Sequence, residues 1–217
     1  KYAYGEDYHT VVKDKCYWML EQLRSQIGDI GGRVFVDSAP VMERVWAEKS
    51  GVGWIGRHGL LINKTQGSYF FIAELIIDLE CEPDGPVKDY CGTCTKCVDA
   101  CPTEAILPDK TLNASHCISY LTIELKTAID EKFSGKMNDW IFGCDICQDV
   151  CPWNRFSKPT NEIRFEPIEA TGYSKADWEQ LEKEQFDRVF KNSAIQRTGF
   201  EGLKRNISFL KKISTNS

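Results

Sequence analysis

The sequence lacks any long hydrophobic run. Its longest apolar stretch, Tyr69–Leu79, is interrupted by Glu74 and Asp78, and a membrane-spanning helix needs about 20 predominantly apolar residues. The first residues also lack the basic, apolar and small-residue regions of a secretory signal. We therefore expect no membrane partner. The closely spaced cysteines described below need a reducing compartment, so we expect the protein in the cytoplasm.

An initial Met is absent as well. The chain begins at Lys1 and enters a helical pattern within a few residues. From this we expect that an N-terminal portion precedes residue 1.

The sequence has no excess of positive charge. Its net charge is −5, which is not the signature of a general nucleic-acid-binding protein. Basic residues are nevertheless concentrated in Arg188–Lys212, where seven Lys and Arg accompany one acid, Glu201. Such a stretch is either a solvated helix face or a contact for an anionic partner such as RNA, and the residues alone leave both open.

Histidine is scarce, with three in 217 residues. None of His9, His58 and His116 has a second ligand at the spacing that a metal site needs. We interpret all three as polar structural residues first. Only His58 is a candidate cofactor contact, because it lies in Gly51–Gly59, where closely spaced glycines let the backbone approach a ligand.

What the sequence does contain is typical of a soluble globular protein with one or two domains, since 42% of residues are hydrophobic and 27% charged. Apolar spacing predicts a first helix over Asp7–Ile27, with Val12, Cys16, Met19, Leu20, Leu23 and Ile27 on one face. The other expected elements are strands at Arg33–Val36, Leu60–Asn63 and Ser68–Leu79, and helices at Val41–Ser50, Lys175–Phe190 (with a Ser174–Asp177 capping box) and Gly202–Lys212.

Cysteine is abundant, with ten residues. A disulfide-stapled fold is a poor interpretation, because the chain is large enough to fold without staples. Eight cysteines instead form Cys91-x2-Cys94-x2-Cys97-x3-Cys101-Pro and Cys144-x2-Cys147-x3-Cys151-Pro, with Cys117 upstream of the second run. This framework is typical of two 4Fe–4S clusters, in which the fourth cysteine of each run binds the other cluster.

On that logic the first cluster takes Cys91, Cys94, Cys97 and Cys151, and the second takes Cys101, Cys117, Cys144 and Cys147. Zinc is the alternative for paired cysteines, but the repeated run closed by Cys-Pro favours iron and sulfur. We expect Cys16 to be a buried core thiol and Cys81 to be structural. The module would conduct electrons, so the chemistry should lie elsewhere.

Asp37 is the candidate for that chemistry. It stands where a predicted strand gives way to the loop Asp37–Pro40, a usual position for catalytic groups. A carboxyl group there could act as a general acid if burial raised its pKa. The alternative is an ordinary helix-capping or loop aspartate.

Together these segments resemble epoxyqueuosine reductase. The residues that carry the resemblance are Lys1–His9, Val36-Asp-Ser-Ala-Pro40, Gly53-Trp-Ile-Gly56, the run ending in Cys101-Pro-Thr-Glu-Ala-Ile106, and Gly143-Cys-Asp-Ile-Cys-Gln-Asp-Val-Cys-Pro-Trp-Asn154. The likeness extends from residue 1 to about Lys212. The cysteine runs occur in many ferredoxin-like proteins, and their combination with the other segments is far more specific.

The resemblance implies an α+β fold: part of an α/β cobalamin-binding reductase domain (1–84), a two-cluster ferredoxin-like domain (85–157) and a C-terminal helical segment (158–217). It implies that cobalamin binds base-off between the first two. The clusters would reduce it to a nucleophilic cobalt(I) state, and the epoxide of epoxyqueuosine at the tRNA wobble position would become the cyclopentene of queuosine, with loss of water.

The resemblance also assigns roles to residues. Asp37 matches the proton donor on the open face of the cobalt. Gly56, Arg57 and His58 would line the corrin by backbone approach. Ser119, just after Cys117, would place the second cluster beside the corrin, which makes the Cys101/Cys117/Cys144/Cys147 cluster the proximal one.

Two departures from the family pattern affect the expected partners. The N-terminal part that completes the cobalamin pocket is absent, so we expect this chain alone to bind cobalamin poorly. A helical-repeat extension that grips tRNA in some members is also absent, so tRNA contact would rest more on Arg188–Lys212. We further expect a monomer and an external electron donor of flavodoxin or ferredoxin type.

Three other functions remain open. A corrinoid reductive dehalogenase would use the same cofactors on another substrate, a plain ferredoxin would carry electrons without a reaction of its own, and a zinc module would be structural. Cobalamin content, tRNA binding and iron content separate these from an epoxyqueuosine reductase.

Overall fold

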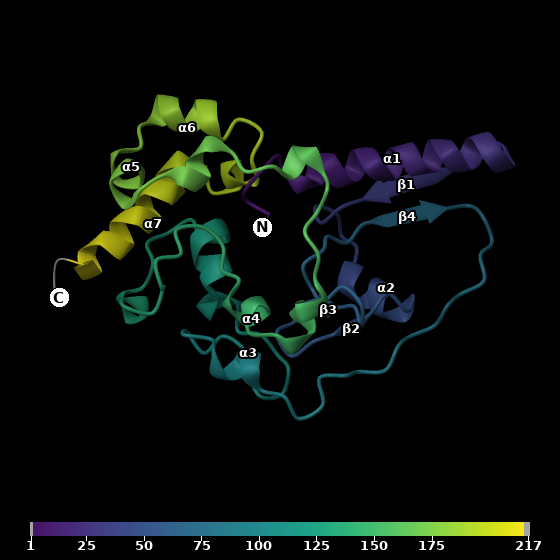
Figure 1. The fold of residues 1–217 in the computed structure, drawn as a ribbon, viewed down its shortest axis with the longest axis horizontal. Helices are drawn as coiled ribbons and strands as arrows, with labels where there is room; N and C mark the ends of the chain where they lie inside the picture. Colours follow the sequence, from purple (N-terminus) through teal and green to yellow (C-terminus); the bar gives the residue numbers. More distant parts are fainter. Residues whose placement is uncertain (1, 215–217) are drawn as a thin grey trace.

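The computed structural model describes residues 2–214, so Lys1 of the first family-like segment lies outside the described residues. The main elements are α1 (Tyr8–Ile27), β1 (Gly32–Phe35), α2 (Glu43–Lys49), β2 (Trp54–Ile55), β3 (Leu61–Ile62), β4 (Glu74–Ile77), α3 (Lys96–Asp99), α4 (Ile146–Asp149), α5 (Lys175–Gln180), α6 (Lys183–Val189) and α7 (Gly199–Ser214). This mixture confirms the expected α+β class (Figure 1). None of the helices in residues 2–214 is long and apolar enough to cross a membrane.

Helix α1 begins and ends close to where its sequence predicts. The Asp7 side chain accepts a hydrogen bond from the His9 backbone N–H, and Gly28 follows the last turn with a φ of 101°. The predicted buried face is largely wrong. Val11 and Leu20 are buried, whereas Met19 and Ile27 are each about half-exposed, because the short β1–β4 pair is the sheet that lies against this helix (Figure 1).

The strands form two small antiparallel pairs. β1 pairs with β4, with Arg33 opposite Ile76, and β2 pairs with β3, with Trp54 opposite Ile62. The predicted strand over Ser68–Leu79 is shorter than expected, since only Glu74–Ile77 is paired. Its first part instead crosses to the cysteine-rich region, where the Ser68 N–H donates to the Asn154 side chain at 2.6 Å.

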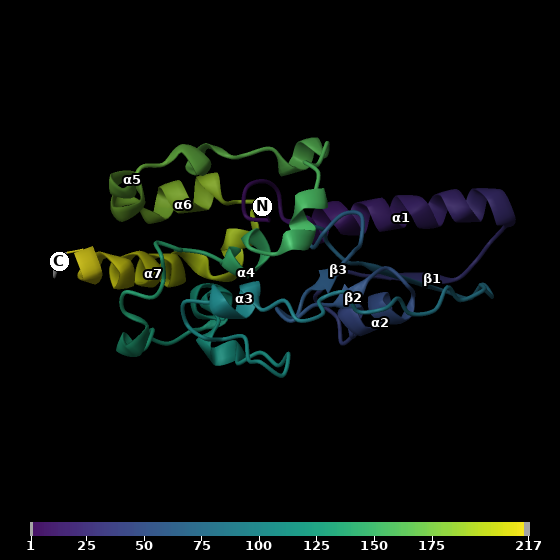
Figure 2. The same cartoon turned by 60° about the horizontal axis from the view of Figure 1, so that its bottom comes forward.

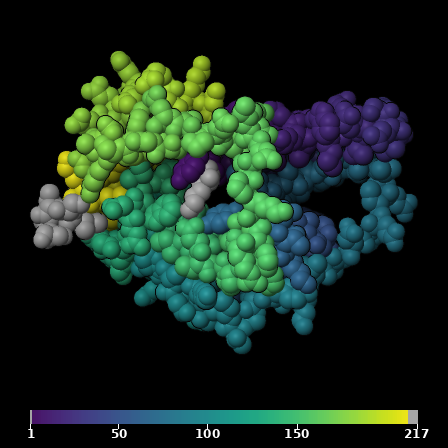
Figure 3. Space-filling model, in the orientation of Figure 1, coloured from purple at the N-terminus to yellow at the C-terminus, as the bar shows by residue number. Residues whose placement is uncertain are grey.

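The segment between β4 and α3 follows the edge of the molecule as an extended, largely exposed strap (Figures 1 and 3). It leads into the short helix α3, which packs against the equally short helix α4. The two helices carry Cys97 and Cys147 of the two cysteine runs. Cys81, on this strap, is exposed, so it is not part of the packed interior as a structural thiol would be.

The C-terminal helices share a core with the cysteine-rich region. Ile123 and Phe142 pack with Leu181, Phe186 and Phe190 in one buried cluster, and α7 lies along this cluster (Figure 2). The predicted single helix over Lys175–Phe190 is two helices, α5 and α6, with Leu181 between them. The Ser174–Asp177 capping box is present. The division at residue 158 stays a prediction, and the core runs across it.

The N-terminal segment is held between these parts. The Ile168 N–H donates to Tyr4 O and the Glu6 N–H to Arg164 O, both at 2.8 Å. The Arg164 guanidinium then binds both carboxylate oxygens of Glu6. Residues that precede α1 are thereby fixed against the segment that precedes α5, and Tyr2 packs against the buried cluster of Ile123 and Phe142.

Candidate functional site

Asp37 lies on a strained turn just after β1. Its φ is 53°, a left-handed conformation that few residues other than glycine adopt and that aspartate tolerates better than most. Its side chain is 51% exposed. The turn therefore presents a carboxylate at the surface of the strand end rather than burying it.

Two neighbouring side chains contact this carboxylate. The Tyr8 hydroxyl donates to Asp37 Oδ2 at 2.9 Å, and His9 Nε2 lies 3.1 Å from the same oxygen. His9 Nδ1 is 2.7 Å from Asp7 Oδ1, so an Asp7–His9–Asp37 chain of polar contacts ends at the site. Burial, followed by the charge of Asp37, raises the pKa of Tyr8, so its hydroxyl stays a donor at neutral pH.

Two further acids lie beneath the turn. The Asp37 N–H donates to the Glu43 carboxylate, and burial raises the pKa of Glu43. Burial, followed by the charge of Glu43, raises the pKa of Glu74 to about 7. Both Glu74 carboxylate oxygens are buried without a partner among the described residues. Sequence reasoning missed these acids, although Glu74 was visible as the charge that interrupts an apolar run.

The glycine-rich segment packs on itself. A Cβ on Gly53 would lie 2.2 Å from Ile62 O, and one on Gly56 would lie 2.5 Å from Ile62 Cδ1. These glycines are therefore required by the β2–β3 pair itself. The Arg57 side chain turns toward the first cysteine run, where it donates to Gly92 O at 3.0 Å and to Pro108 O at 3.1 Å.

His58 holds one unused donor. It is 4% exposed, and burial lowers its pKa to about 4, so the ring is neutral at physiological pH. Its Nδ1 accepts from the Leu60 N–H at 3.2 Å, which leaves the hydrogen on Nε2. That Nε2 is buried and has no hydrogen-bond partner in the described part of the chain.

The structure gathers the first set of cysteines. Burial raises the pKa of Cys97, and the nearby thiols of Cys151 and Cys91 raise it further. Burial likewise raises the pKa of Cys151, and the nearby thiols of Cys91 and Cys94 raise it further. These four thiols are thus electrostatic neighbours although Cys151 is far away in sequence.

The second set is gathered in the same way. Burial raises the pKa of Cys144 to about 11, with Cys117 and Cys101 as neighbouring thiols, and that of Cys147 to about 12, with Cys144 and Cys117 foremost. Buried thiols of this kind ionise when a metal supplies compensating charge. All ten cysteines are free thiols, and within residues 2–214 no three His, Cys, Asp or Glu side chains are arranged to hold a single metal ion.

Aromatic rings connect Asp37 with the second set of cysteines. The Tyr2 ring lies 5.7 Å from both the Tyr8 and the Phe142 rings. A Cβ on Gly143, the neighbour of Cys144, would lie 3.7 Å from the edge of the Tyr2 ring. Ser119 Oγ contacts Cys144 O at 3.5 Å, so the predicted cofactor residue Ser119 faces this cysteine loop. These ring contacts of Tyr2 with Tyr8 and Phe142 could not be foreseen from the sequence.

The basic stretch Arg188–Lys212 is mostly occupied by contacts within the chain. Arg205 donates to backbone carbonyls. Four other cations contact the side chain or backbone of an acidic residue: Arg188 with Glu169, Arg197 with Glu124, and Lys204 and Lys211 with Glu179. The Lys212 side chain lies outside the described residues. These contacts favour a structural role for the stretch over the expected tRNA contact.

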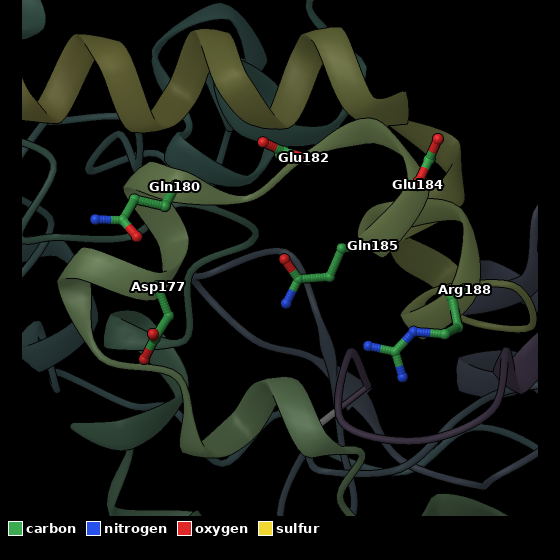
Figure 4. Close-up of a pocket in the computed structure, with 6 residues that line it drawn as sticks. All are labelled: Asp177, Gln180, Glu182, Glu184, Gln185 and Arg188. Atoms are coloured by element: carbon green, nitrogen blue, oxygen red, sulfur yellow. The ribbon is translucent and has the colours of Figure 1, made fainter.

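A cavity of about 520 Å³ lies between α5 and α6 (Figure 4). Its lining is polar and contains no predicted site residue; it consists of Asp177, Gln180, Glu182, Glu184, Gln185 and Arg188. Asp177 serves the capping box and Arg188 pairs with Glu169. The cavity is therefore separate from the Asp37 region and from the cysteines.

Family models match two segments of the chain. Residues 90–154 match the family model described as 4Fe-4S double cluster binding domain. Residues 1–38, which include Tyr8, His9 and Asp37, match the model described as Epoxyqueuosine reductase QueG, DUF1730.

Curated relatives and solved structures agree with these matches. The epoxyqueuosine reductase of Cyclobacterium marinum is 62% identical over 97% of this chain and 68% of its own length. A crystal structure of epoxyqueuosine reductase with an epoxyqueuosine-modified tRNA-Tyr stem loop superposes with a TM-score of 0.90 at 32% identity, covering 97% of this chain and 56% of that one.

A structure of the Bacillus subtilis epoxyqueuosine reductase, with its aspartate-bearing catalytic loop swung out of the active site, superposes with a TM-score of 0.90 at 30% identity. It covers 99% of this chain and 57% of that one. The chain thus spans about two thirds of the Cyclobacterium marinum relative and a little over half of the two solved chains.

Proposed function

Because the chain belongs to the epoxyqueuosine reductase family, we propose that it reduces the epoxide of epoxyqueuosine to the cyclopentene of queuosine at the wobble position of tRNA. The observation that carries the proposal is the Asp37 turn. It presents a carboxylate held by Tyr8 and His9, and aromatic rings join it to the loop of Cys144. The overall change takes up two electrons and two protons and releases one water.

The two 4Fe–4S clusters of the matched domain would supply the electrons. We assign Cys91, Cys94, Cys97 and Cys151 to one cluster and Cys101, Cys117, Cys144 and Cys147 to the other. The electrostatic neighbours of the buried cysteines support this division. Cys97 is also among the thiols that raise the pKa of Cys147, which supports neighbouring clusters, as electron transfer between them requires. The cluster of Cys117 and Cys144 is the one nearer the Asp37 region.

Residues of this chain fit a bound cobalamin. The buried His58 Nε2–H lacks an acceptor among the described residues, and an amide oxygen at the edge of a corrin would satisfy it. Gly56 and Arg57 would contribute backbone, since the Arg57 side chain is engaged with the first cysteine loop, and Ser119 would stand between the corrin and the proximal cluster. When bound, cobalamin would supply a reduced, nucleophilic cobalt centre.

Asp37 would supply the proton. An epoxide oxygen leaves poorly as an alkoxide, so C–O cleavage needs an acid at that oxygen. The half-exposed Asp37 carboxyl group can reach a substrate, and Tyr8 orients it through the 2.9 Å hydrogen bond. A bound substrate would supply the burial that favours the protonated form of this carboxyl group. His9, 3.1 Å from the same oxygen, can return a proton to Asp37 and is itself held by Asp7.

The partners follow from this chemistry. The substrate is a tRNA that carries epoxyqueuosine, as in the stem-loop complex of the related enzyme. An external protein of flavodoxin or ferredoxin type would reduce the clusters. We propose that the protein works as a cytoplasmic monomer, where free thiols stay reduced.

The test uses the full-length protein with clusters and cobalamin reconstituted without oxygen. After incubation with epoxyqueuosine-containing tRNA and a chemical reductant, mass spectrometry of the digested tRNA should show queuosine. Iron analysis should give about eight iron atoms per chain. Dehalogenation of a chlorinated substrate without tRNA turnover would instead indicate a reductive dehalogenase. Clusters without either reaction would indicate a ferredoxin, and zinc in place of iron would contradict the cluster assignment.

A further inference from the structure

Trp54 makes a side-chain contact with a cluster cysteine. Its indole Nε1 lies 3.5 Å from Cys91 Sγ, which is within the range of a hydrogen bond to sulfur. An indole N–H can only donate, so the sulfur is the acceptor. The two residues are 37 positions apart, and they belong to β2 and to the start of the first cysteine run.

The indole is held in place from several sides. Trp54 is 1% exposed, and its ring packs edge-on against Trp153 at 5.0 Å and Tyr90 at 5.3 Å. Its backbone pairs with Ile62 in the β2–β3 sheet. Because backbone and ring are both fixed, the N–H direction toward Cys91 is built into the fold.

The glycine-rich segment Gly51–Gly59 makes a second contact with the first cysteine run. The Arg57 guanidinium donates to Gly92 O, one residue after Cys91, and to Pro108 O. Two side chains of the segment Gly51–Gly59 thus fix the first cysteine run, one of them through the sulfur itself. This is a role for the Gly53-Trp-Ile-Gly56 motif that a cofactor pocket alone does not explain.

Hydrogen bonds to cluster sulfurs change the reduction potential. A donor stabilises the extra negative charge of the reduced cluster more than that of the oxidised one, and so raises the potential. The second set of cysteines receives a comparable donation from the backbone, since the Ala105 N–H donates to Cys101 Sγ at 3.3 Å. The contact to Cys91 comes from a side chain, so it can be removed by substitution.

We propose that the Trp54 indole N–H sets the reduction potential of the cluster held by Cys91, Cys94, Cys97 and Cys151, keeping it higher than the cysteines alone would. The inference rests on the cluster assignment of the proposed function. Trp54 acts through the sulfur of Cys91. By raising the reduction potential, it makes the cluster of Cys91 a better acceptor for an electron that arrives from the external donor.

The test is a redox titration of the cluster-loaded protein, followed by electron paramagnetic resonance. Trp54→Phe should lower the midpoint of one cluster and leave the other unchanged. At a fixed potential, the oxidised-to-reduced ratio of that cluster should rise by up to about tenfold, which for one electron is about 59 mV. Trp178→Phe is the matched control, because it removes an indole that packs on Tyr173 and Phe190 and not on Trp54, and it should leave both midpoints in place.

A second variant separates the hydrogen bond from packing. Trp54→3-benzothienylalanine keeps the ring shape and replaces only the N–H, so it should reproduce the lowered midpoint with iron content unchanged. An unchanged midpoint in this variant would overturn the proposal, and so would an equal shift in Trp178→Phe. The titration needs neither tRNA nor cobalamin. Its result therefore tests the role of Trp54 even if the protein does not reduce epoxyqueuosine.

Discussion

The Tyr8 hydroxyl donates a 2.9 Å hydrogen bond to the Asp37 carboxylate, and Tyr8 is fixed by a parallel ring contact with Phe71 at 4.3 Å. The first predicted change is Tyr8→Phe. It keeps the ring contact and removes the hydrogen bond to the Asp37 carboxyl group, which contributes up to about 1.5 kcal/mol. We expect turnover to fall roughly tenfold with little change in the tRNA concentration that gives half-maximal rate.

A matched control is available for this change. Tyr173 makes a similar 2.8 Å hydrogen bond to Glu169, away from Asp37. Tyr173→Phe should leave turnover unchanged. Equal activity in wild type and Tyr8→Phe would mean that this hydrogen bond does not orient the acid.

The Asp7–His9–Asp37 chain predicts a separate effect of His9→Gln. Glutamine can keep a polar contact with Asp37 but cannot pass a proton, so the first turnover should proceed while later ones slow by about tenfold or more. Single-turnover and steady-state assays of queuosine formation compare the two. Helix α1 should persist, because its cap uses the His9 backbone N–H. Equal slowing in both assays would contradict a role in returning the proton.

Glu74 predicts a pH dependence of stability. Burial raises its pKa to about 7, above the ordinary value of a glutamate, so the folded protein holds this proton more tightly than the unfolded chain does. The associated stability is present at low pH and is lost as the pH rises through about 7. Glu74→Gln removes this loss, so the variant should gain thermal stability relative to wild type between pH 6 and pH 8.

The control for Glu74 is Glu82→Gln, at an exposed position. It should give the same difference from wild type at both pH values. Thermal unfolding followed by circular dichroism measures both variants. A difference for Glu74→Gln that does not change with pH would show that this carboxyl group is not buried as described.

Arg205 predicts that part of the basic stretch is structural. Its guanidinium donates to the carbonyls of Leu121 and Thr127 at 2.9 Å, and burial lowers its pKa. Arg205→Ala should destabilise the fold by about 2 kcal/mol, because these carbonyls lose a charged donor. Lys191→Ala, at an exposed position, should be neutral by the same thermal measurement. Weaker tRNA binding in Arg205→Ala without loss of stability would instead favour an RNA contact.

Much of this arrangement was predictable from local sequence. Asp7 and Gly28 fix the ends of α1, the Ser174–Asp177 box starts α5, and the cysteine spacing indicated two clusters. These features depend on residues a few positions apart. The turn at Asp37 was also foreseen, because an Asp before a Ser-Ala-Pro sequence interrupts a strand.

What could not be predicted depends on distant contacts. The expected strand from Ser68 is diverted by Asn154, 86 positions away, and no periodicity reports such a bond. The expected apolar face of α1 is exposed at Met19 and Ile27, because the spacing does not reveal how narrow the sheet beneath it is. The contact of Trp54 with Cys91 could not be predicted either, because the two residues are 37 positions apart.

The most direct test of the central claim is a single-turnover assay of Asp37→Asn. Asparagine tolerates the left-handed backbone of this turn and resembles aspartate in shape, but it cannot act as an acid. We predict at least a roughly hundredfold slower queuosine formation, with iron content and tRNA binding equal to wild type, and a similar loss in Asp37→Ala. Full turnover in either variant would contradict the assignment of Asp37 as the proton donor.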